Sequence, residues 1–278
     1  MSNLLRKTRH VLCKRHVFGI TSSLRVLPNL LVIGAVRSGT TSLYHNLAQH
    51  PCITKSAYDE IGFFDDNFHL GLNWYRSMFP TKFHKEKIIK KYGKFLTYDV
   101  TPFYIYNERV PERIYNLLPD IKLIAVLRNP VDRAYSNYHL SKRESRITES
   151  FEEIIEKEKR NLIHINRNDK EEYYKFVHTS LLARGFYAEQ LERWYKIFPK
   201  KQIMIIKSEE FAAETNKIMN KIFEFLELKK HYMKNVVKKN EAHYVPMRKE
   251  TRKMLIDYFY PHNKKLYSIL GRNFDWEN

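Results

Sequence analysis

Cysteine is scarce in this sequence, and long hydrophobic runs are missing. The two cysteines, Cys13 and Cys52, lie far apart and form no C-x-x-C pair, so the sequence indicates neither a disulfide framework nor a cysteine metal site. There is no run of about 18 apolar residues, the length that a transmembrane helix requires. The basic N-terminal segment also lacks the apolar stretch of about 7–15 residues that marks a secretory signal. These absences predict a cytoplasmic protein.

Acidic residues are also few compared with basic ones. The chain has 49 Lys+Arg against 31 Asp+Glu, which gives a formal net charge of +18. A field of this sign favours anionic partners, which include nucleotides, acidic polysaccharides, nucleic acids and membrane surfaces. A lysine-rich solvated surface gives the same composition, so the charge by itself does not choose among these interpretations.

Internal repeats and low-complexity segments are absent as well, and strand and helix patterns alternate along the chain. Apolar runs predict strands at residues 27–35, 94–100, 121–129 and 201–207. Periodic patterns and end signals predict helices at residues 38–51, 101–119, 130–145, 150–175, 180–199, 208–228 and 248–270. Residues 52–80 and 229–247 are predicted to be mostly loop. The alternation predicts an α/β protein with a P-loop-like, three-layer α/β/α fold and a mostly parallel central sheet.

The chain is long enough for one large α/β domain or two small ones. Hydrophobic residues make up 43% of it, which is enough for a packed core. No convincing linker interrupts it, so residues 28–278 are predicted to form one domain and residues 1–27 a basic N-terminal tail. A basic amphipathic segment that touches a membrane or the domain itself remains a second interpretation of that tail.

The loop after the first strand is nearly a phosphate-binding loop, but it lacks the usual lysine. Gly34 and Gly39 have the spacing of G-x-x-x-x-G-K-[ST], whereas Thr40 stands at the lysine position and Arg37 is the only charge. Backbone N–H groups at a helix start bind phosphate without any side chain. Four hydroxyl side chains add possible donors: Ser38, Thr40, Thr41 and Ser42. The loop therefore predicts a phosphate-type ligand without ATP hydrolysis, although an ordinary strand–turn–helix connection would also use glycines.

The third strand ends in a cation where a metal-dependent nucleotide triphosphatase often has an aspartate. Arg128 stands at this place, and Ser136 follows two helical turns later. A cation there suits a second anionic group on the ligand and not a metal ion. A structural role for Arg128, as a cap or in an ion pair, remains open.

The aromatic loop between the first two predicted strands contains a candidate catalytic base, Glu60. Glu60 follows Asp59 and precedes Phe63 and Phe64. A neighbouring negative charge and restricted solvent both raise the pKa of a carboxyl group, which suits it to act as a base. On its own, Glu60 is better explained as a solvated surface acid than as a base.

Together these segments resemble the sulfotransferases that use 3′-phosphoadenosine 5′-phosphosulfate (PAPS). The resemblance spans about residues 28–276 and rests on RSGTTSL, LRNPVDRAYSNY, DEIGFFD, GLNWYRSMFP, GFYAEQLERWYKIFP and the C-terminal segment that begins YVPMRKET. The E-I-x-F-F block with G-L-x-W-Y is most similar to the heparan-sulfate type, which comprises the N-sulfotransferase domains and the 3-O-sulfotransferases.

The resemblance implies a role for each motif. It implies that Arg37, Ser38, Gly39, Thr40, Thr41 and Ser42 bind the 5′-phosphosulfate, that Arg128 and Ser136 bind the 3′-phosphate, and that Glu60 is the catalytic base. Arg37 would also stabilise charge on the bridging oxygen, in place of a metal ion. The implied acceptor is a carbohydrate hydroxyl or amine, and an anionic glycan suits the net charge. No nucleic-acid partner is implied. Animal members are anchored in Golgi membranes, and no anchor is seen here, which again predicts a cytoplasmic enzyme.

The sequence departs from the family pattern in ways that leave alternatives open. Val100 replaces a second catalytic lysine, and the C-terminal basic loop is altered, with Lys239 and His243 as candidate contacts. A polyanion-binding relative without catalysis would explain Val100. A P-loop kinase with Asp99 as a metal ligand is a further alternative. His69 is the next candidate base if Glu60 is not the base.

Overall fold

The computed structural model describes residues 17–162, 176, 179–239 and 244–277. Its centre is one sheet of five parallel strands in the order β2-β3-β1-β4-β5. The strands are β1 (Leu30–Gly34), β2 (Ile53–Lys55), β3 (Leu96–Val100), β4 (Lys122–Leu127) and β5 (Ile203–Lys207). The strands β1 and β4 are neighbours, and the strand order changes direction between them. The loops that follow these two strands therefore meet at the carboxyl end of the sheet.

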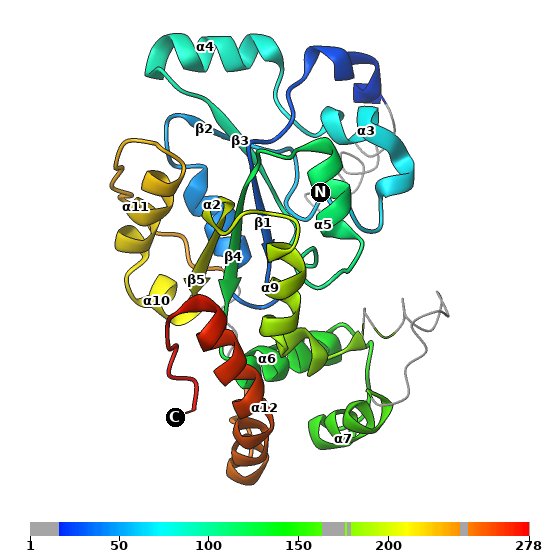
Figure 1. Ribbon diagram of the computed structural model, residues 1–278. Coiled ribbons are helices and arrows are strands. Elements are labelled where there is room, and N and C mark those ends of the chain that lie inside the picture. Colours follow the sequence, from blue (N-terminus) through cyan, green and yellow to red (C-terminus); the bar gives the residue numbers. More distant parts are fainter. Residues whose placement is uncertain (1–16, 163–175, 177–178, 240–243, 278) are drawn as a thin grey trace.

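Helices cover both faces of this sheet (Figure 1). The α-helices are α2 (Thr40–Leu47), α3 (Gly71–Ser77), α4 (Lys82–Tyr92), α5 (Val110–Leu117), α6 (Pro130–Arg143), α7 (Phe151–Asn161), α9 (Tyr187–Tyr195), α10 (Ser208–Ala213), α11 (Thr215–Phe225) and α12 (Lys249–Leu270). The 3-10 helices are η1 (Val17–Leu24), η2 (Phe68–Leu70), η3 (Ala183–Gly185) and η4 (Lys200–Gln202).

The core is divided by the sheet into two layers. Side chains of β1 alternate between them, since Leu31 and Ile33 join one buried cluster while Leu30 and Val32 join the other. The first cluster includes side chains of α3, α5 and α9, and the second includes side chains of α2 and α11. The predicted three-layer fold with a parallel sheet is therefore confirmed.

Local elements agree with the prediction where the pattern is strongly apolar and differ elsewhere. The four predicted strands and the helices at α2, α6 and α12 are present. The predicted loop 52–80 contains β2 and α3. The predicted helix 101–119 is helical only in α5, because the Ile105 N–H donates to the Ile33 carbonyl of β1 and so is not part of a helix. Part of the predicted helix 150–175 lies outside the described residues.

Two further predicted helices are shorter than expected for physical reasons that the structure shows. The helix predicted at 208–228 is divided into α10 and α11, because Glu214 has the non-helical angles φ −126° and ψ 50°. The helix predicted at 180–199 is reduced to α9. The backbone before it is bound by a buried carboxylate, that of Glu158 on α7.

The described part of the predicted N-terminal tail is packed against the domain. The Arg25 guanidinium donates to the Phe79 carbonyl at 2.7 Å, and the Val26 N–H donates to the Pro80 carbonyl at 3.1 Å. Arg25 and Thr81 form an isolated antiparallel bridge, and η1 contacts α3. Residues 1–16 lie outside the described residues, and the domain boundary at residue 28 stays a prediction.

Candidate active site

The loop between β1 and α2 is shaped by close backbone contacts. The Ala35 N–H donates to the Val126 carbonyl of β4 at 2.7 Å. A Cβ atom on Gly34 would lie 2.4 Å from the Ile105 side chain, so the backbone approach there requires glycine. Gly39 has φ +92°, which only glycine adopts readily, and α2 begins at the next residue. The start of α2 is thereby turned toward the end of the sheet, as in a phosphate-binding loop.

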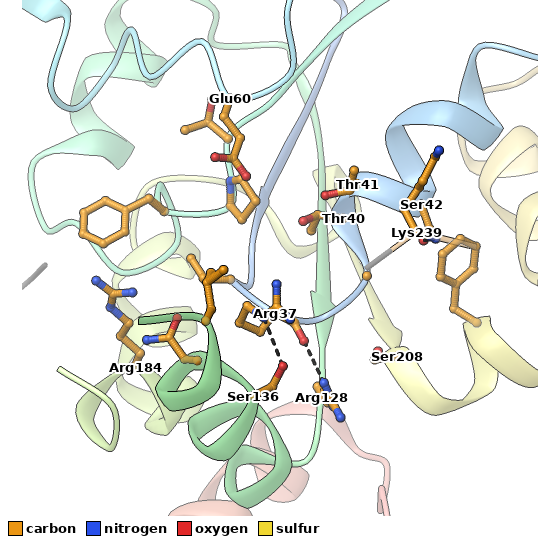
Figure 2. Close-up of a pocket in the computed structure, with 18 of the residues that line it drawn as sticks. Arg37, Thr40, Thr41, Ser42, Glu60, Arg128, Ser136, Arg184, Ser208 and Lys239 are labelled. Carbon is orange, nitrogen blue, oxygen red and sulfur yellow. Dashed lines mark hydrogen bonds between the residues drawn. The ribbon is translucent and has the colours of Figure 1, made fainter. Parts of the chain in front are cut away.

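A cavity of about 920 Å³ lies at this end of the sheet. Figure 2 shows its wall, with Glu60 on one side and Arg128 on the other. The predicted site residues that line it are Arg37, Gly39, Thr40, Thr41, Ser42, Glu60, Arg128 and Ser136. Ser38 lies behind the wall, with its side chain fully buried and its carbonyl accepting a hydrogen bond from Ser208 Oγ at 2.9 Å. The structure therefore brings together every predicted site residue except Ser38.

Arg37 and Arg128 are joined in one hydrogen-bonded network (Figure 2). Arg37 Nε donates to Ser136 Oγ at 3.0 Å, and Arg128 Nη1 donates to the Arg37 carbonyl at 3.2 Å. The Tyr187 hydroxyl donates to the Arg128 carbonyl at 3.0 Å. Burial lowers the pKa of Arg37, and the nearby Arg128 charge adds to this, whereas Tyr244 opposes it. Two predicted anion-binding groups from distant motifs thus form a single unit.

Glu60 is fixed by its backbone while its carboxylate faces the cavity. Its N–H donates to the Val100 carbonyl at 2.8 Å, and its φ of +56° is unusual for a residue with a side chain. The pKa of Glu60 is raised, first by burial in the cavity wall and then by the Asp59 charge, while Arg37 opposes the rise. The expected effect of Asp59 is therefore present. The phenylalanines that follow Glu60 lie in the core, where Phe63 stacks on Tyr75 at 4.3 Å, and they do not cover the carboxylate.

Asp99 does not have the surroundings of a metal ligand. Its carboxylate is fully buried and accepts hydrogen bonds from the hydroxyls of Thr101 at 2.8 Å, Tyr104 at 3.0 Å and Tyr75 at 3.1 Å. Burial raises the pKa of Asp99 to about 6, although these hydroxyl donors lower it. The kinase alternative loses its best support, because this carboxylate is buried and bonded to three hydroxyl groups of the protein.

Three other predicted candidates have different outcomes. Val100 is buried at the end of β3 and presents no polar group. His69 lies outside the cavity wall, with its Nδ1 3.1 Å from the Asp66 carbonyl oxygen. Lys239 does line the cavity, and its backbone N–H donates to Ser42 Oγ at 2.9 Å. His243 lies outside the described residues.

Arg184 is a cation of this cavity that the sequence did not reveal. It is 7% exposed, and its guanidinium lies 4.8 Å from the centre of the Phe103 ring. Burial lowers the pKa of Arg184 to about 10, which leaves it charged at neutral pH. Glu158 holds the preceding backbone, since its carboxylate accepts from the N–H groups of Leu181 at 2.7 Å, Leu182 at 3.0 Å and Ala183 at 3.0 Å. The Arg184-Gly185 pair was the available signal, because a glycine is unusual inside a helix. The prediction of a continuous helix at 180–199 did not take that glycine into account.

The profile of a family described as "Sulfotransferase domain" matches residues 27–264. The chain belongs to the sulfotransferase family. The resemblance seen in the sequence is thereby confirmed, and the enzyme is a PAPS-dependent sulfotransferase. A sulfotransferase from Alicyclobacillus acidocaldarius has a similar structure, with a TM-score of 0.71, 26% identity and coverage of 91% of this chain and 100% of that one.

Curated relatives of known name support the same family. The membrane-associated sulfotransferase kil1 of Dictyostelium discoideum is 28% identical, over 93% of this chain and 68% of the relative. Heparan sulfate glucosamine 3-O-sulfotransferase 3A1 of Mus musculus is 30% identical, over 90% of this chain and 65% of the relative. The bifunctional heparan sulfate N-deacetylase/N-sulfotransferase 4 of Mus musculus is 30% identical, over 88% of this chain and 30% of the relative. The chain thus spans from under a third to about two thirds of these proteins.

The prediction of a cytoplasmic location is wrong by this comparison. The relative that matches 93% of the chain is a membrane-associated enzyme. The prediction relied on the lack of a long apolar run, and that lack does not exclude other modes of membrane association. Within the described residues, no helix has the length and apolarity needed to cross a membrane.

Proposed function

We propose that this sulfotransferase binds PAPS across the cavity with two groups of residues. The 5′-phosphosulfate would lie on the loop from Arg37 to Ser42, and the 3′-phosphate beside Arg128 and Ser136. The observation that carries this proposal is the hydrogen-bonded link of Arg37 to Ser136 and Arg128, which places two cations in one cavity. Arginines bind phosphate and sulfate oxygens through paired N–H donors. A cavity of about 920 Å³ lies within the usual range for ligand sites of this kind.

The proposed reaction requires one proton acceptor and one stabilised leaving group. The acceptor oxygen or nitrogen forms a bond to sulfur while the bond from sulfur to the bridging phosphate oxygen breaks. The acceptor's proton passes to the Glu60 carboxylate, and adenosine 3′,5′-bisphosphate leaves with the electron pair of the broken bond. Glu60 faces the cavity with a raised pKa, which suits a general base. Arg37 would meet the charge that develops on the bridging oxygen.

We propose a carbohydrate hydroxyl or amine as the acceptor. Relatives at about 30% identity carry heparan sulfate in their names, and the net charge of +18 suits an anionic glycan. The test is transfer of labelled sulfate from PAPS to a panel of glycans, desulfated glycans, lipids and small alcohols. Transfer to glycans above the other classes supports the proposal, and transfer to small alcohols or lipids alone contradicts it.

Arg128→Ala is expected to weaken the binding of adenosine 3′,5′-bisphosphate. The variant loses a charge-assisted hydrogen bond, worth about 1.5–3 kcal/mol or about one to two decades of affinity. Ser136→Ala should cost less, because water can replace a single neutral hydrogen bond. Titration calorimetry in the presence and absence of EDTA measures both effects and tests independence from metal.

Each of these two expectations, the role of Arg128 and the independence from metal, has an outcome that would contradict it. Unchanged affinity of a folded Arg128→Ala variant removes Arg128 from the ligand site. Binding that is lost in EDTA shows that a metal ion takes part. The matched control is Lys196→Ala, which removes an exposed cation at the carboxyl-terminal cap of α9. This variant should bind the bisphosphate as the wild type does.

A further inference from the structure

Exposed apolar side chains are concentrated in two neighbouring elements, η1 and α4. Twelve large hydrophobic residues are exposed in the described part of the chain, and half of them lie in these two short helices. They are Phe18, Ile20 and Leu24 of η1 and Phe83, Ile89 and Tyr92 of α4. Ile20 is 87% exposed and Phe83 is 77% exposed. Exposed apolar side chains that gather on neighbouring elements are typical of an interaction surface.

The two helices are joined where their ends meet. Arg25, just after η1, pairs with Thr81, the residue that caps the start of α4 by accepting from the His84 N–H. Leu24 and Phe83 therefore come from adjoining backbone segments. Figure 1 shows η1 (dark blue) and α4 at the same end of the molecule. His84 anchors α4 to the sheet, since its Nε2 lies 3.0 Å from Thr54 Oγ1 of β2.

The surface of α4 is strongly basic as well as apolar. Its sequence KFHKEKIIKKY has five lysines and one glutamate, and none of its residues is buried. Lysines next to exposed aromatic and aliphatic residues are typical of helices that lie in the interface of an anionic membrane. A soluble polyanion such as a glycan would use the lysines but not Phe83 or Ile20. A second copy of this chain would bring like charges together.

We propose that η1 and α4 form a membrane-docking surface for anionic lipid headgroups. The apolar side chains enter the headgroup region, and the lysines of α4 pair with the lipid phosphates or carboxylates. The active-site cavity lies at the carboxyl ends of the strands, whereas α4 leads into the amino end of β3. A docked enzyme would thus direct its cavity away from the lipid, toward acceptors outside the membrane.

Vesicle sedimentation with the full chain tests this surface. The vesicles are phosphatidylcholine alone or phosphatidylcholine with phosphatidylserine, near physiological salt. The charge variant carries Lys82→Glu, Lys87→Glu and Lys90→Glu. Its control carries Lys249→Glu, Lys253→Glu and Lys264→Glu, three exposed lysines of α12. Both variants change the net charge equally.

The wild type is expected to bind the anionic vesicles and not the neutral ones. Each lysine near an anionic surface contributes about fivefold in affinity, so loss of three lysines weakens binding by about 100-fold. The α4 variant should bind at least that much more weakly, because each glutamate is also repelled by the anionic lipid, whereas the α12 variant should bind nearly as the wild type does. An apolar variant, Ile20→Ser with Phe83→Ser, keeps every charge and should lose about tenfold or more. Equal melting temperatures exclude unfolding as the cause.

Several results would overturn the proposal. Equal losses in the α4 and α12 variants would mean that only net charge matters. Full vesicle binding by the apolar variant would show that no side chain enters the bilayer. Loss of heparin binding in the α4 variant, with vesicle binding intact, would identify a glycan surface. Light scattering could instead show that the wild type forms a concentration-dependent dimer and that the apolar variant stays monomeric. That result would identify a second copy of this chain as the occupant of the surface.

Discussion

Glu60→Gln should slow sulfuryl transfer by about 10²–10⁴-fold, the usual contribution of a general base. Glutamine keeps the size of the side chain but cannot take the acceptor's proton. The backbone bond of Glu60 to Val100 does not depend on the side chain, so the cavity keeps its shape. Affinity for adenosine 3′,5′-bisphosphate should therefore change little. The measurement is single-turnover transfer of labelled sulfate at saturating PAPS.

Asp59 and His69 provide matched controls for Glu60. Asp59→Asn and His69→Asn should each retain most of the activity, because His69 lies outside the cavity wall and Asp59 acts on Glu60 only through its charge. A Glu60→Gln enzyme within a few-fold of the wild type would end this assignment. Loss of activity in His69→Asn alone would transfer the role of base to the histidine.

The raised pKa of Glu60 also fixes the direction of its pH dependence. The base works when it is deprotonated, so kcat/KM should fall as the pH drops through the pKa of Glu60, which lies above the ordinary value of 4.5. Asp59 raises this pKa by charge repulsion. Asp59→Asn should therefore lower the pKa and extend activity to lower pH. A shift of the acid limb to higher pH would contradict the electrostatic interpretation.

The sequence predicted the fold best where local pattern and burial agree. The strands β1, β3 and β4 are fully or almost fully buried, so their apolar runs are continuous and easily read. The strand β2 has only three residues, with one buried, and leaves no such run. The helix α4 has no buried residue, so it shows no amphipathic pattern that would reveal it.

The site could be predicted only as far as its residues belong to contiguous motifs. Arg37 and Arg128 follow adjacent parallel strands, and a parallel α/β fold brings the carboxyl ends of such strands together at one end of the sheet. Arg184 reaches the same cavity through a backbone segment that the buried Glu158 carboxylate holds. That contact joins residues more than twenty positions apart, so no local pattern records it. The surroundings of Glu60 were likewise only half predicted, because its two phenylalanines turn into the core.

Arg37→Ala should reduce turnover far more than it reduces affinity for adenosine 3′,5′-bisphosphate. The proposed partner of the guanidinium is the sulfuryl end and the bridging oxygen, and the product lacks the sulfuryl group. An interaction that is strongest in the transition state appears in kcat. Loss of one donor to developing negative charge costs about 10²–10³-fold. Product affinity, measured by calorimetry, should fall by only about tenfold or less, since Arg128 keeps its own charge.

Arg37→Lys separates the charge of Arg37 from its geometry. Lysine keeps the positive charge but loses the Nε donor that holds Ser136 at 3.0 Å in the wild type. Because the positive charge is kept, Arg37→Lys should retain much of the turnover that Arg37→Ala loses. Arg37 also lowers the pKa of Glu60, so Arg37→Ala should move the acid limb of kcat/KM to higher pH, whereas Arg37→Lys should leave it close to the wild-type position. Equal losses of turnover and product affinity in Arg37→Ala would instead identify Arg37 as a simple phosphate anchor, since a group that binds substrate, transition state and product alike gives the reaction no acceleration.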